Sequence, residues 1–263
     1  MITAIIQARM GSTRLPGKVL LPLGDKAVLE HVIGRTKKAN TIDKIIVATS
    51  KTERDDAIET LCKKIHVACF RGNAGDVLDR YYQCAKKHSI AHIARITADC
   101  PLIDPDIIDR AGAIYVKGNY DYVSTAYPIP TFPDGLDVEI FSFTALEKTW
   151  QEALLPSQRE HVTPYIWKHP ALFRIKTINA FVSRGLEIKN EVDLSAYRFT
   201  LDEPRDYDFL KIIFERVRPL DTKHILAFLK KHPEVRNLNQ KIKRNEGYEK
   251  SLIHDNDEIN QHE

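Results

Sequence analysis

Short apolar runs alternate with amphipathic segments along the first 120 residues of the chain. The apolar runs predict buried strands at 2–6, 43–49, 67–70 and 91–97. The intervening segments repeat their apolar residues at helical spacing, which predicts amphipathic helices at 26–38, 54–64, 76–87 and 107–117. Strands and helices that alternate in this way are typical of an α/β fold with a mostly parallel sheet.

The alternation stops after Tyr120. Three prolines, at 128, 130 and 133, exclude regular structure there. We interpret residues 120–190 as an insertion that covers the carboxyl edge of the sheet like a small lid. Helical spacing returns at 207–216 and 222–231. The polar residues 239–263 predict a frayed or disordered tail outside a domain that spans 1–238.

The composition is that of an ordinary globular domain, because 43% of the 263 residues are hydrophobic and 29% are charged. No apolar run approaches the roughly 20 residues of a membrane span, and the first run has the wrong length and flanks for a signal peptide. The four cysteines lack the spacing of zinc or redox motifs. A net charge of +3 is too mild to indicate nucleic-acid binding. We therefore expect a cytoplasmic protein with neither a membrane nor a nucleic acid as partner.

The loop after the first strand has the composition of a phosphate site. Three cations, Arg9, Arg14 and Lys18, share it with hydroxyls and with two glycines that let backbone N–H groups turn toward one anion. Five residues separate Gly11 from Gly17, so the loop is not a Walker motif, and G-x-G-x-x-G is absent. The loop predicts a triphosphate cradle; the alternative is a surface loop with solvated charges.

Two acids follow probable strands at the same edge of the sheet. Asp99 comes just after the strand at 91–97, and Asp202 repeats this arrangement before a helix. Mg²⁺ takes carboxylate and phosphate oxygens, so Asp99 is a sensible ligand, against the alternative of an aspartate that only forms a turn. Arg71 directly follows a strand as well, and Asp79 and Arg80 are near enough in sequence to reach the same pocket.

Three further side chains are candidates for binding a substrate. Asp137 and Glu139 share one face of a probable strand, where acids bind sugar hydroxyls or assist a metal; the alternative is a solvent-facing surface. His161 lies in the polar heptapeptide 159–165. On its own it is more typical of a structural histidine.

Several motifs together resemble a known family. The segment R-x-x-S-T-R-L-P-G-K, from Arg9 to Lys18, resembles the signature of sugar-activating cytidylyltransferases such as the CMP-Kdo and CMP-sialic acid synthetases. Residues 99–102 look like the D-x-P-L element of these enzymes, and 200–206 match T-x-D-x-P-x-D. The stretches 135–141 and 159–165 resemble the branch of spore-coat polysaccharide biosynthesis protein F.

The resemblance implies a fold of the nucleotide-diphosphosugar-transferase type, Rossmann-like, with helices on both faces of a mixed sheet. It implies transfer of CMP from CTP to an acidic sugar or to a phosphorylated or phosphonate acceptor, with pyrophosphate as the leaving group, in surface polysaccharide or glycoconjugate biosynthesis. Mg²⁺ is the implied cofactor and a homodimer the implied assembly.

The residues that would carry this activity fall into three groups. The catalytic residues would be Arg14, Lys18, Asp99 and Asp202, the last two as metal ligands. Nucleotide contacts would come from Gln7, Ala8, Arg9, Met10, Gly11, Ser12 and Arg71. Substrate contacts would come from Asp137, Glu139 and His161.

Two rival functions belong to other classes. A glycosyltransferase of GT-A type would use a nucleotide sugar and a D-x-D motif. This motif occurs at 104–106, where the acids are expected to begin a helix, and at 206–208 and 255–257, outside the sheet half. A non-catalytic nucleotide-binding module would have lost polar loop positions or acids, and both are present here.

Overall fold

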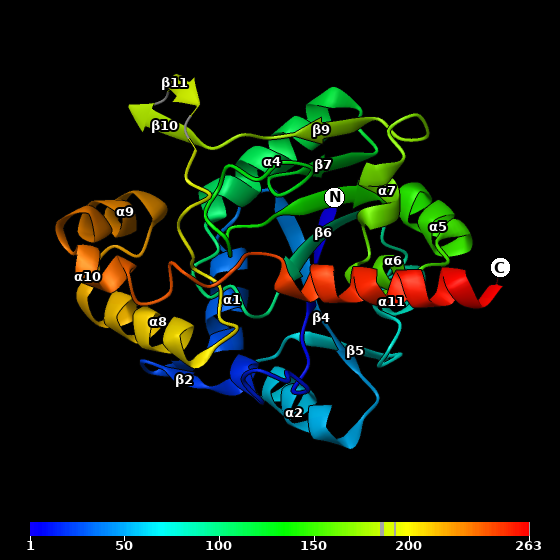
Figure 1. The fold of residues 1–263 in the computed structure, drawn as a ribbon, viewed down its shortest axis with the longest axis horizontal. Helices are drawn as coiled ribbons and strands as arrows, with labels where there is room; N and C mark the ends of the chain where they lie inside the picture. Colours follow the sequence, from blue (N-terminus) through cyan, green and yellow to red (C-terminus); the bar gives the residue numbers. More distant parts are fainter. Residues whose placement is uncertain (185–186, 192, 263) are drawn as a thin grey trace.

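A computed structural model describes residues 1–184, 187–191 and 193–262. At its centre lies a sheet of seven strands (Figure 1). Their order across the sheet is β5 (Ala68–Gly72), β4 (Ile42–Ser50), β1 (Ile2–Gln7), β6 (His92–Thr97), β8 (Glu139–Ser142), β7 (Tyr122–Ser124) and β9 (Ile175–Thr177). The first four are parallel, and β8 runs antiparallel to both of its neighbours. The expected mixed, mostly parallel sheet is confirmed.

Helices cover both faces of this sheet. Alternate residues of β1 point to opposite sides, so Ala4 and Ile6 join one apolar core and Ile5 the other. The first core is closed by α1 (Val28–Thr36), α2 (Asp56–Lys64), α4 (Pro105–Gly118), α8 (Pro204–Arg216), α9 (Thr222–Lys231) and α10 (Pro233–Arg236). The second is closed by α3 (Val77–Lys87), α5 (Phe143–Glu152) and α7 (Pro164–Lys168). Both cores are continuous, which confirms the α/β class.

The strand register gathers the predicted loops at one edge. Gln7, the last residue of β1, is opposite Ala48 of β4 and Thr97 of β6. The segments that follow these strands therefore leave the sheet side by side. A short 3₁₀ turn, η1 (Lys18–Leu20), and a two-stranded ribbon of β2 (Pro22–Leu23) and β3 (Lys26–Ala27) connect the first loop to α1.

The interpretation of 120–190 as a lid is wrong for most of its length. Its strands β7, β8 and β9 extend the main sheet beyond β6. They have only three or four residues each, too few to show a periodic pattern. The proline-rich stretch between β7 and β8 does lack helices and strands, as expected. A separate hairpin of β10 (Phe181–Arg184) and β11 (Glu187–Glu191) stands away from the body in Figure 1.

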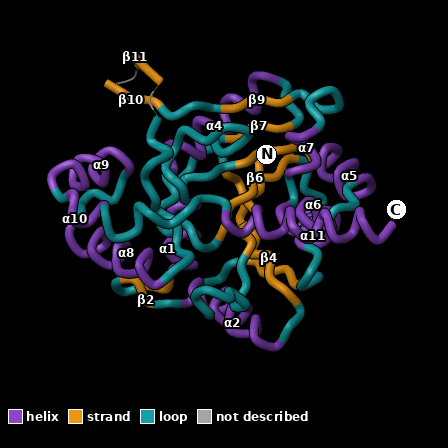
Figure 2. The backbone as a smooth tube through the Cα atoms, in the orientation of Figure 1, coloured by secondary structure: helices purple, strands orange, loops and turns teal. Residues whose placement is uncertain are grey.

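The expectation of a frayed or disordered C-terminal tail is also wrong. Residues 237–245 cross the molecule as turns and loop, and α11 (Glu246–His262) then packs along α6 (Pro156–His161) (Figure 2). The contacts are polar: Asp255 accepts hydrogen bonds from the Ser157 amide at 2.8 Å and the Ser157 hydroxyl at 2.6 Å. Within the described part of the chain, no helix has the length and apolar character needed to cross a membrane.

Candidate active site

The loop after β1 is shaped by its own backbone. The Ser12 and Gly17 amides both donate to the Met10 carbonyl at 3.0 Å, and the Ser12 hydroxyl accepts from the Leu15 amide at 3.2 Å. Gly17 has a φ of +71°, a left-handed conformation that favours glycine. This turn aims the side chain of Lys18 inward, so that the residue is only 8% exposed.

The ammonium group of Lys18 lies between the two predicted metal ligands. Its Nζ is 2.6 Å from Asp99 Oδ2 and 2.7 Å from Asp202 Oδ1. The Leu201 amide donates to the Asp99 carbonyl at 2.8 Å, which holds the end of β6 against the segment before α8. Two acids separated by a hundred residues in sequence are thus brought together, and a cation of the chain itself separates them.

This contact decides the charges at the centre of the site. Burial alone would raise the pKa of Asp99, but the nearby Lys18 ammonium and its hydrogen bond lower the pKa to about 2. Burial works against the charged form of Lys18 too, yet Asp99 and Asp202 raise the pKa of the ammonium. Asp99 and Lys18 are therefore both ionised at neutral pH.

Further arginines reach Asp202. Arg198 donates to Asp202 at 2.9 Å and also pairs with Asp134 and Asp206 at 2.5 and 2.9 Å. The guanidinium of Arg14 lies 3.2 Å from Asp202 and 3.6 Å from Glu203. Glu246, the first residue of α11, holds the same guanidinium at 2.8 Å. Arg14 is thus surrounded by three carboxylates.

These groups face a cleft of about 600 Å³. The first loop, the ends of β1 and β6, the segment before β8, α6 and α11 all contribute to its walls. The residues from the sequence prediction that line it are Gln7, Ala8, Arg9, Gly11, Ser12, Arg14, Lys18, Asp99, Asp137, His161 and Asp202. Most of the predicted site is therefore one continuous surface.

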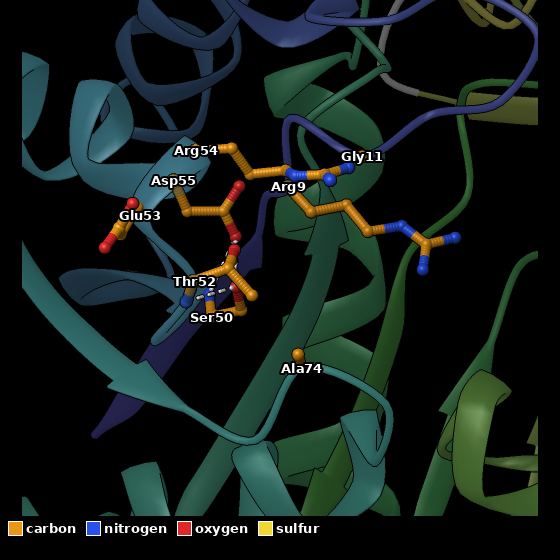
Figure 3. Close-up of a pocket in the computed structure, with 8 residues that line it drawn as sticks. All are labelled: Arg9, Gly11, Ser50, Thr52, Glu53, Arg54, Asp55 and Ala74. Carbon is orange, nitrogen blue, oxygen red and sulfur yellow. Dashed lines mark hydrogen bonds between the residues drawn. The ribbon is translucent and has the colours of Figure 1, made fainter.

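A second cavity of about 550 Å³ opens on the other side of the first loop (Figure 3). Arg9 and Gly11 line both cavities, so the two meet at the loop. Figure 3 shows Ser50 and Asp55 turned toward one another; the Ser50 hydroxyl donates to Asp55 at 2.5 Å. Asp55 also accepts from the Met10 amide at 2.8 Å, which ties the loop to the end of β4.

Two predicted nucleotide ligands do not face either cavity. Met10 lies outside both linings, and its side chain packs on the apolar core beside Gly17. Arg71 is turned toward α2, where its guanidinium pairs with Asp56 and Glu59 at 2.6 and 3.0 Å and donates to backbone carbonyls. The expected nucleotide contacts of these two side chains are therefore corrected: they hold the structure around the cavities. Arg80 does line the cleft, whereas Asp79 bonds to Trp150.

Glu139 is a third correction. It is 2% exposed and lies outside the cleft lining. Its carboxylate pairs with Arg95 and accepts from the hydroxyls of Tyr122 and Thr163, both at 2.5 Å. This carboxylate is buried and turned toward these partners, away from a substrate in the cleft. Glu139 instead holds Arg95, which lines the cleft.

The other two predicted substrate ligands do face the cleft. Asp137 accepts from Arg244 at 2.6 Å, and burial raises the pKa of this carboxyl despite that pairing. His161 Nε2 lies 3.0 Å from the Ser251 hydroxyl, and burial lowers the pKa of the imidazole to about 4. His161 is therefore neutral at physiological pH.

Sequence reasoning missed several residues of the cleft. Arg95 could have been recognised from the sequence, because a single arginine within the mostly apolar strand β6 is unusual and indicates a specific role. Tyr127 lies among prolines in a segment with no periodic pattern. The C-terminal residues of the cleft, including Lys243, Tyr248 and Ser251, belong to the segment that the sequence predicts as a tail. Only the folded chain shows that this segment closes one wall.

The acids of the cleft provide only part of a metal site. In the described residues, no three or more His, Cys, Asp or Glu side chains are gathered into a metal site. Asp99 and Asp202 alone converge, around Lys18. Mg²⁺ is commonly held by one or two carboxylates and completed by water and substrate phosphates. The two acids therefore fit a cation that arrives with a triphosphate, and do not form a complete metal cage.

Two proteins are similar to this chain over most of its length. The uncharacterized protein MJ1063 of Methanocaldococcus jannaschii is 41% identical over 92% of this chain and 96% of its own length. Spore coat polysaccharide biosynthesis protein SpsF of Bacillus subtilis is 33% identical over 89% of this chain and 96% of its own length.

Two solved structures have a similar fold. A cytidylyltransferase from Leptospira borgpetersenii is 35% identical, with a TM-score of 0.81 over 92% of this chain and 99% of that one. A CMP-2-keto-3-deoxy-manno-octonic acid synthetase solved with CTP matches with a TM-score of 0.60 at 16% identity, covering 82% of this chain and 98% of that one, which supports the Rossmann-like nucleotidyltransferase fold. The model of the family described as cytidylyltransferase matches residues 3–246. The chain belongs to the cytidylyltransferase family and is a nucleotidyltransferase.

Proposed function

We propose that this enzyme transfers CMP from CTP to an acidic sugar or a related anionic acceptor and releases pyrophosphate. The observation that carries the proposal is the position of Lys18 at the end of the first loop, where its ammonium group forms ion pairs with both Asp99 and Asp202. Arg9 and Arg14 flank this group on the same cleft. Cations and paired acids in one loop-lined cleft fit a triphosphate and its counterion.

In the proposed reaction, an acceptor oxygen attacks the α-phosphorus and the bond to the pyrophosphate oxygen breaks. The pyrophosphate leaves with the bonding electron pair. Lys18 and Arg14 neutralise charge on the β- and γ-phosphates as it develops, which is the main requirement of such a transfer. A phosphate or phosphonate acceptor attacks as an anion, whereas a sugar hydroxyl gives its proton to a carboxylate of the cleft.

Asp99 and Asp202 would hold Mg²⁺ when the nucleotide is bound. The ion would supply charge neutralisation at the α-phosphate. Arg14 must leave Glu246 to reach the phosphates, and Lys18 must share its two acids with the ion. A neighbour in fold, at 16% identity, is described as a manganese complex, which is consistent with divalent-ion use in this fold.

The cavity beside the first loop is the proposed site of the nucleoside. It adjoins the cleft at Arg9 and Gly11, so a nucleotide can span both spaces. Cytosine carries an amino donor where uracil carries a carbonyl acceptor. The hydroxyl of Thr52 in this cavity and backbone carbonyls near Gln7 and Ala8 in the adjoining cleft are the proposed partners of that donor.

The names of similar proteins support the choice of acceptor. SpsF is named for polysaccharide biosynthesis, and the neighbour in fold solved with CTP is named for an acidic sugar. On this basis we propose a role in surface polysaccharide or glycoconjugate biosynthesis. The homodimer and the cytoplasmic location remain predictions from the family resemblance. Light scattering of the purified chain tests the dimer directly.

Pyrophosphate release tests the proposal. The enzyme is incubated with Mg²⁺, CTP and a panel of acidic sugars and sugar phosphates, and UTP and ATP replace CTP in parallel. We expect release only with an acceptor, and a kcat/KM for CTP at least about tenfold above that for UTP. Equal use of CTP and UTP, or no release with any acceptor, would contradict the proposed reaction.

A further inference from the structure

The C-terminal helix brings an unpaired tyrosine hydroxyl to the cleft. Tyr248, in the first turn of α11, lines the cleft, and its hydroxyl is buried without a hydrogen-bond partner in the described chain. Buried polar groups in folded proteins are nearly always paired, because an unpaired group loses its bonds to water. An unpaired donor at the wall of a substrate cleft therefore points to a ligand that supplies the missing acceptor.

Other aromatic rings pack against the ring of Tyr248. The Tyr248 ring meets His161 edge-on at 5.2 Å and Trp167 at 5.9 Å between centroids. Trp167 stacks on Tyr127 at 5.0 Å, and Tyr127 again lines the cleft. The indole Nε1 of Trp167 is a second buried donor without a partner among the described residues. These four residues, Tyr127, His161, Trp167 and Tyr248, form what we call the aromatic wall.

The helix that carries Tyr248 is firmly placed. The Ser251 hydroxyl, one turn further along, donates to Glu160 at 2.7 Å and lies 3.0 Å from His161 Nε2. Asp255, another turn along, holds both the amide and the hydroxyl of Ser157, and both residues are buried. Tyr248 is therefore held at the cleft by two successive turns of α11.

We propose that the aromatic wall is the binding surface for the ring of the acceptor sugar, and that the Tyr248 hydroxyl donates a hydrogen bond to an acceptor oxygen. A sugar presents C–H groups on its ring face, which pack on aromatic rings, and oxygens at its edge, which accept hydrogen bonds. Lys250 and Arg9 also line the cleft, where they pair with Glu246 and Glu160 at 2.8 and 3.6 Å; a negatively charged sugar would compete with these two acids for the cations. The inference rests on the proposed function and assigns the specificity for its acceptor to the C-terminal helix.

The test compares the wild type with Tyr248→Phe, which keeps the ring and removes only the hydroxyl. Tyr165→Phe is the matched control, because its hydroxyl, on the neighbouring helix α7, bonds to Glu152 at an exposed position away from the cleft. The probes are Kdo, N-acetylneuraminate, glucuronate and glucose 1-phosphate, each with CTP and Mg²⁺. Pyrophosphate release gives KM for the probe and for CTP, and calorimetry gives CTP binding.

We expect at least one acidic sugar to be used, and Tyr248→Phe to raise the KM for that sugar about tenfold while the KM for CTP stays within twofold. Tyr165→Phe should leave both constants unchanged. Because the hydroxyl has no partner in the free protein, the melting temperature of Tyr248→Phe should not fall.

Four results would overturn the inference. They are an unchanged KM for the sugar in Tyr248→Phe, a rise confined to the KM for CTP, a melting temperature lowered by several degrees, and CTP binding without use of any of the four probes. The second would place the nucleotide base on the aromatic wall. If the wild type does not bind CTP at all, the proposed function itself fails, and this outcome is separate from the other four.

Discussion

A single ammonium group sets the electrostatics of the cleft. Lys18 belongs to a segment whose glycines, proline and charges predict an exposed loop, yet it is nearly buried against Asp99 and Asp202. The sequence does not reveal this, because the two acids that enclose Lys18 lie 81 and 184 positions away in the chain. The residue predicted to bind phosphate is at the same time the partner of the residues predicted to bind metal.

Replacing Lys18 with methionine should therefore affect both activity and stability. We expect kcat/KM to fall about 10²-fold, the scale for loss of one preorganised charge contact. The free energy of unfolding should also fall, by about 2 kcal/mol or more, because two partly buried carboxylates lose their cation. Lys26→Met, at an exposed position, is the control. Pyrophosphate release and urea unfolding measure the two effects, and wild-type stability in Lys18→Met would contradict the second.

His161 makes the stability depend on pH. Burial lowers its pKa in the folded protein to about 4, below the value of about 6.5 in an unfolded chain. The unfolded state therefore takes up the proton first, and stability is lost as the pH falls from about 6.5 toward 4. Between pH 7 and pH 5, the wild type should lose about 2 kcal/mol more than His161→Gln. Parallel pH slopes of unfolding free energy in the two proteins would show that the imidazole is not buried.

At the scale of elements, the sequence predicted the first half of the chain well. The expected helices at 54–64 and 76–87 agree closely with α2 and α3, because apolar stripes and buried runs define these elements. The helix α11 was missed for the opposite reason. Ser251 and Asp255 make its hydrogen bonds to α6, so this helix is held by polar side chains and has no apolar stripe to detect.

The site was predicted to a similar extent. Motif positions in the first loop and at the strand ends fall in the cleft, since strand order fixes where they lie. The orientations of the Arg71 and Glu139 side chains could not be predicted from the sequence. Each side chain turns toward an ion-pair partner, Glu59 for Arg71 and Arg95 for Glu139, and not into the cleft. Pairings of this kind depend on packing between elements and leave no local pattern.

Helix α11 should also influence nucleotide binding. Glu246 holds Arg14 at 2.8 Å, and the proposed function requires Arg14 to bind phosphate instead. Removing this competing carboxylate with Glu246→Gln should lower the KM for CTP several-fold. Glu234→Gln is the control, because Glu234 is exposed and pairs with His232 outside the cleft. A higher KM in Glu246→Gln would mean that Glu246 supports the nucleotide-bound form.

At the scale of the whole molecule, two segments that line the cleft, one around Asp134 and one around Arg198, lie in close backbone contact. The segment before β8 and the segment before Asp202 pair through backbone hydrogen bonds, with Asp134 bonded to Tyr197 at 2.9 Å and to Phe199 at 2.6 Å. Gly135 lies at this contact with a φ of +98°. A Cβ there would come within 2.5 Å of the Thr200 amide nitrogen. The position of Asp202 thus depends on a glycine far away in sequence.

Gly135→Ala should lower the free energy of unfolding by at least about 2 kcal/mol, from backbone strain and the clash with Thr200. Gly34→Ala is a matched control, because Gly34 lies in α1 with no atom near the added methyl group. That change should instead stabilise the protein by about 0.5–1 kcal/mol, as alanine favours the helix. Chemical denaturation measures both, and equal effects of the two substitutions would contradict this close backbone contact.

The position of Lys18 also has a consequence for the stability of the enzyme when no metal ion is present. Since the chain carries its own counterion for the two acids, the resting enzyme has no repulsion for an added ion to relieve, and its fold owes nothing to metal supply. We therefore expect the nucleotide-free protein to melt at the same temperature in EDTA as in millimolar Mg²⁺, while turnover stops in the chelator and resumes at once when Mg²⁺ returns. A melting temperature lowered by EDTA would show that an ion is resident. An unchanged melting temperature would instead indicate that the ion binds together with each nucleotide and leaves at the end of each catalytic cycle.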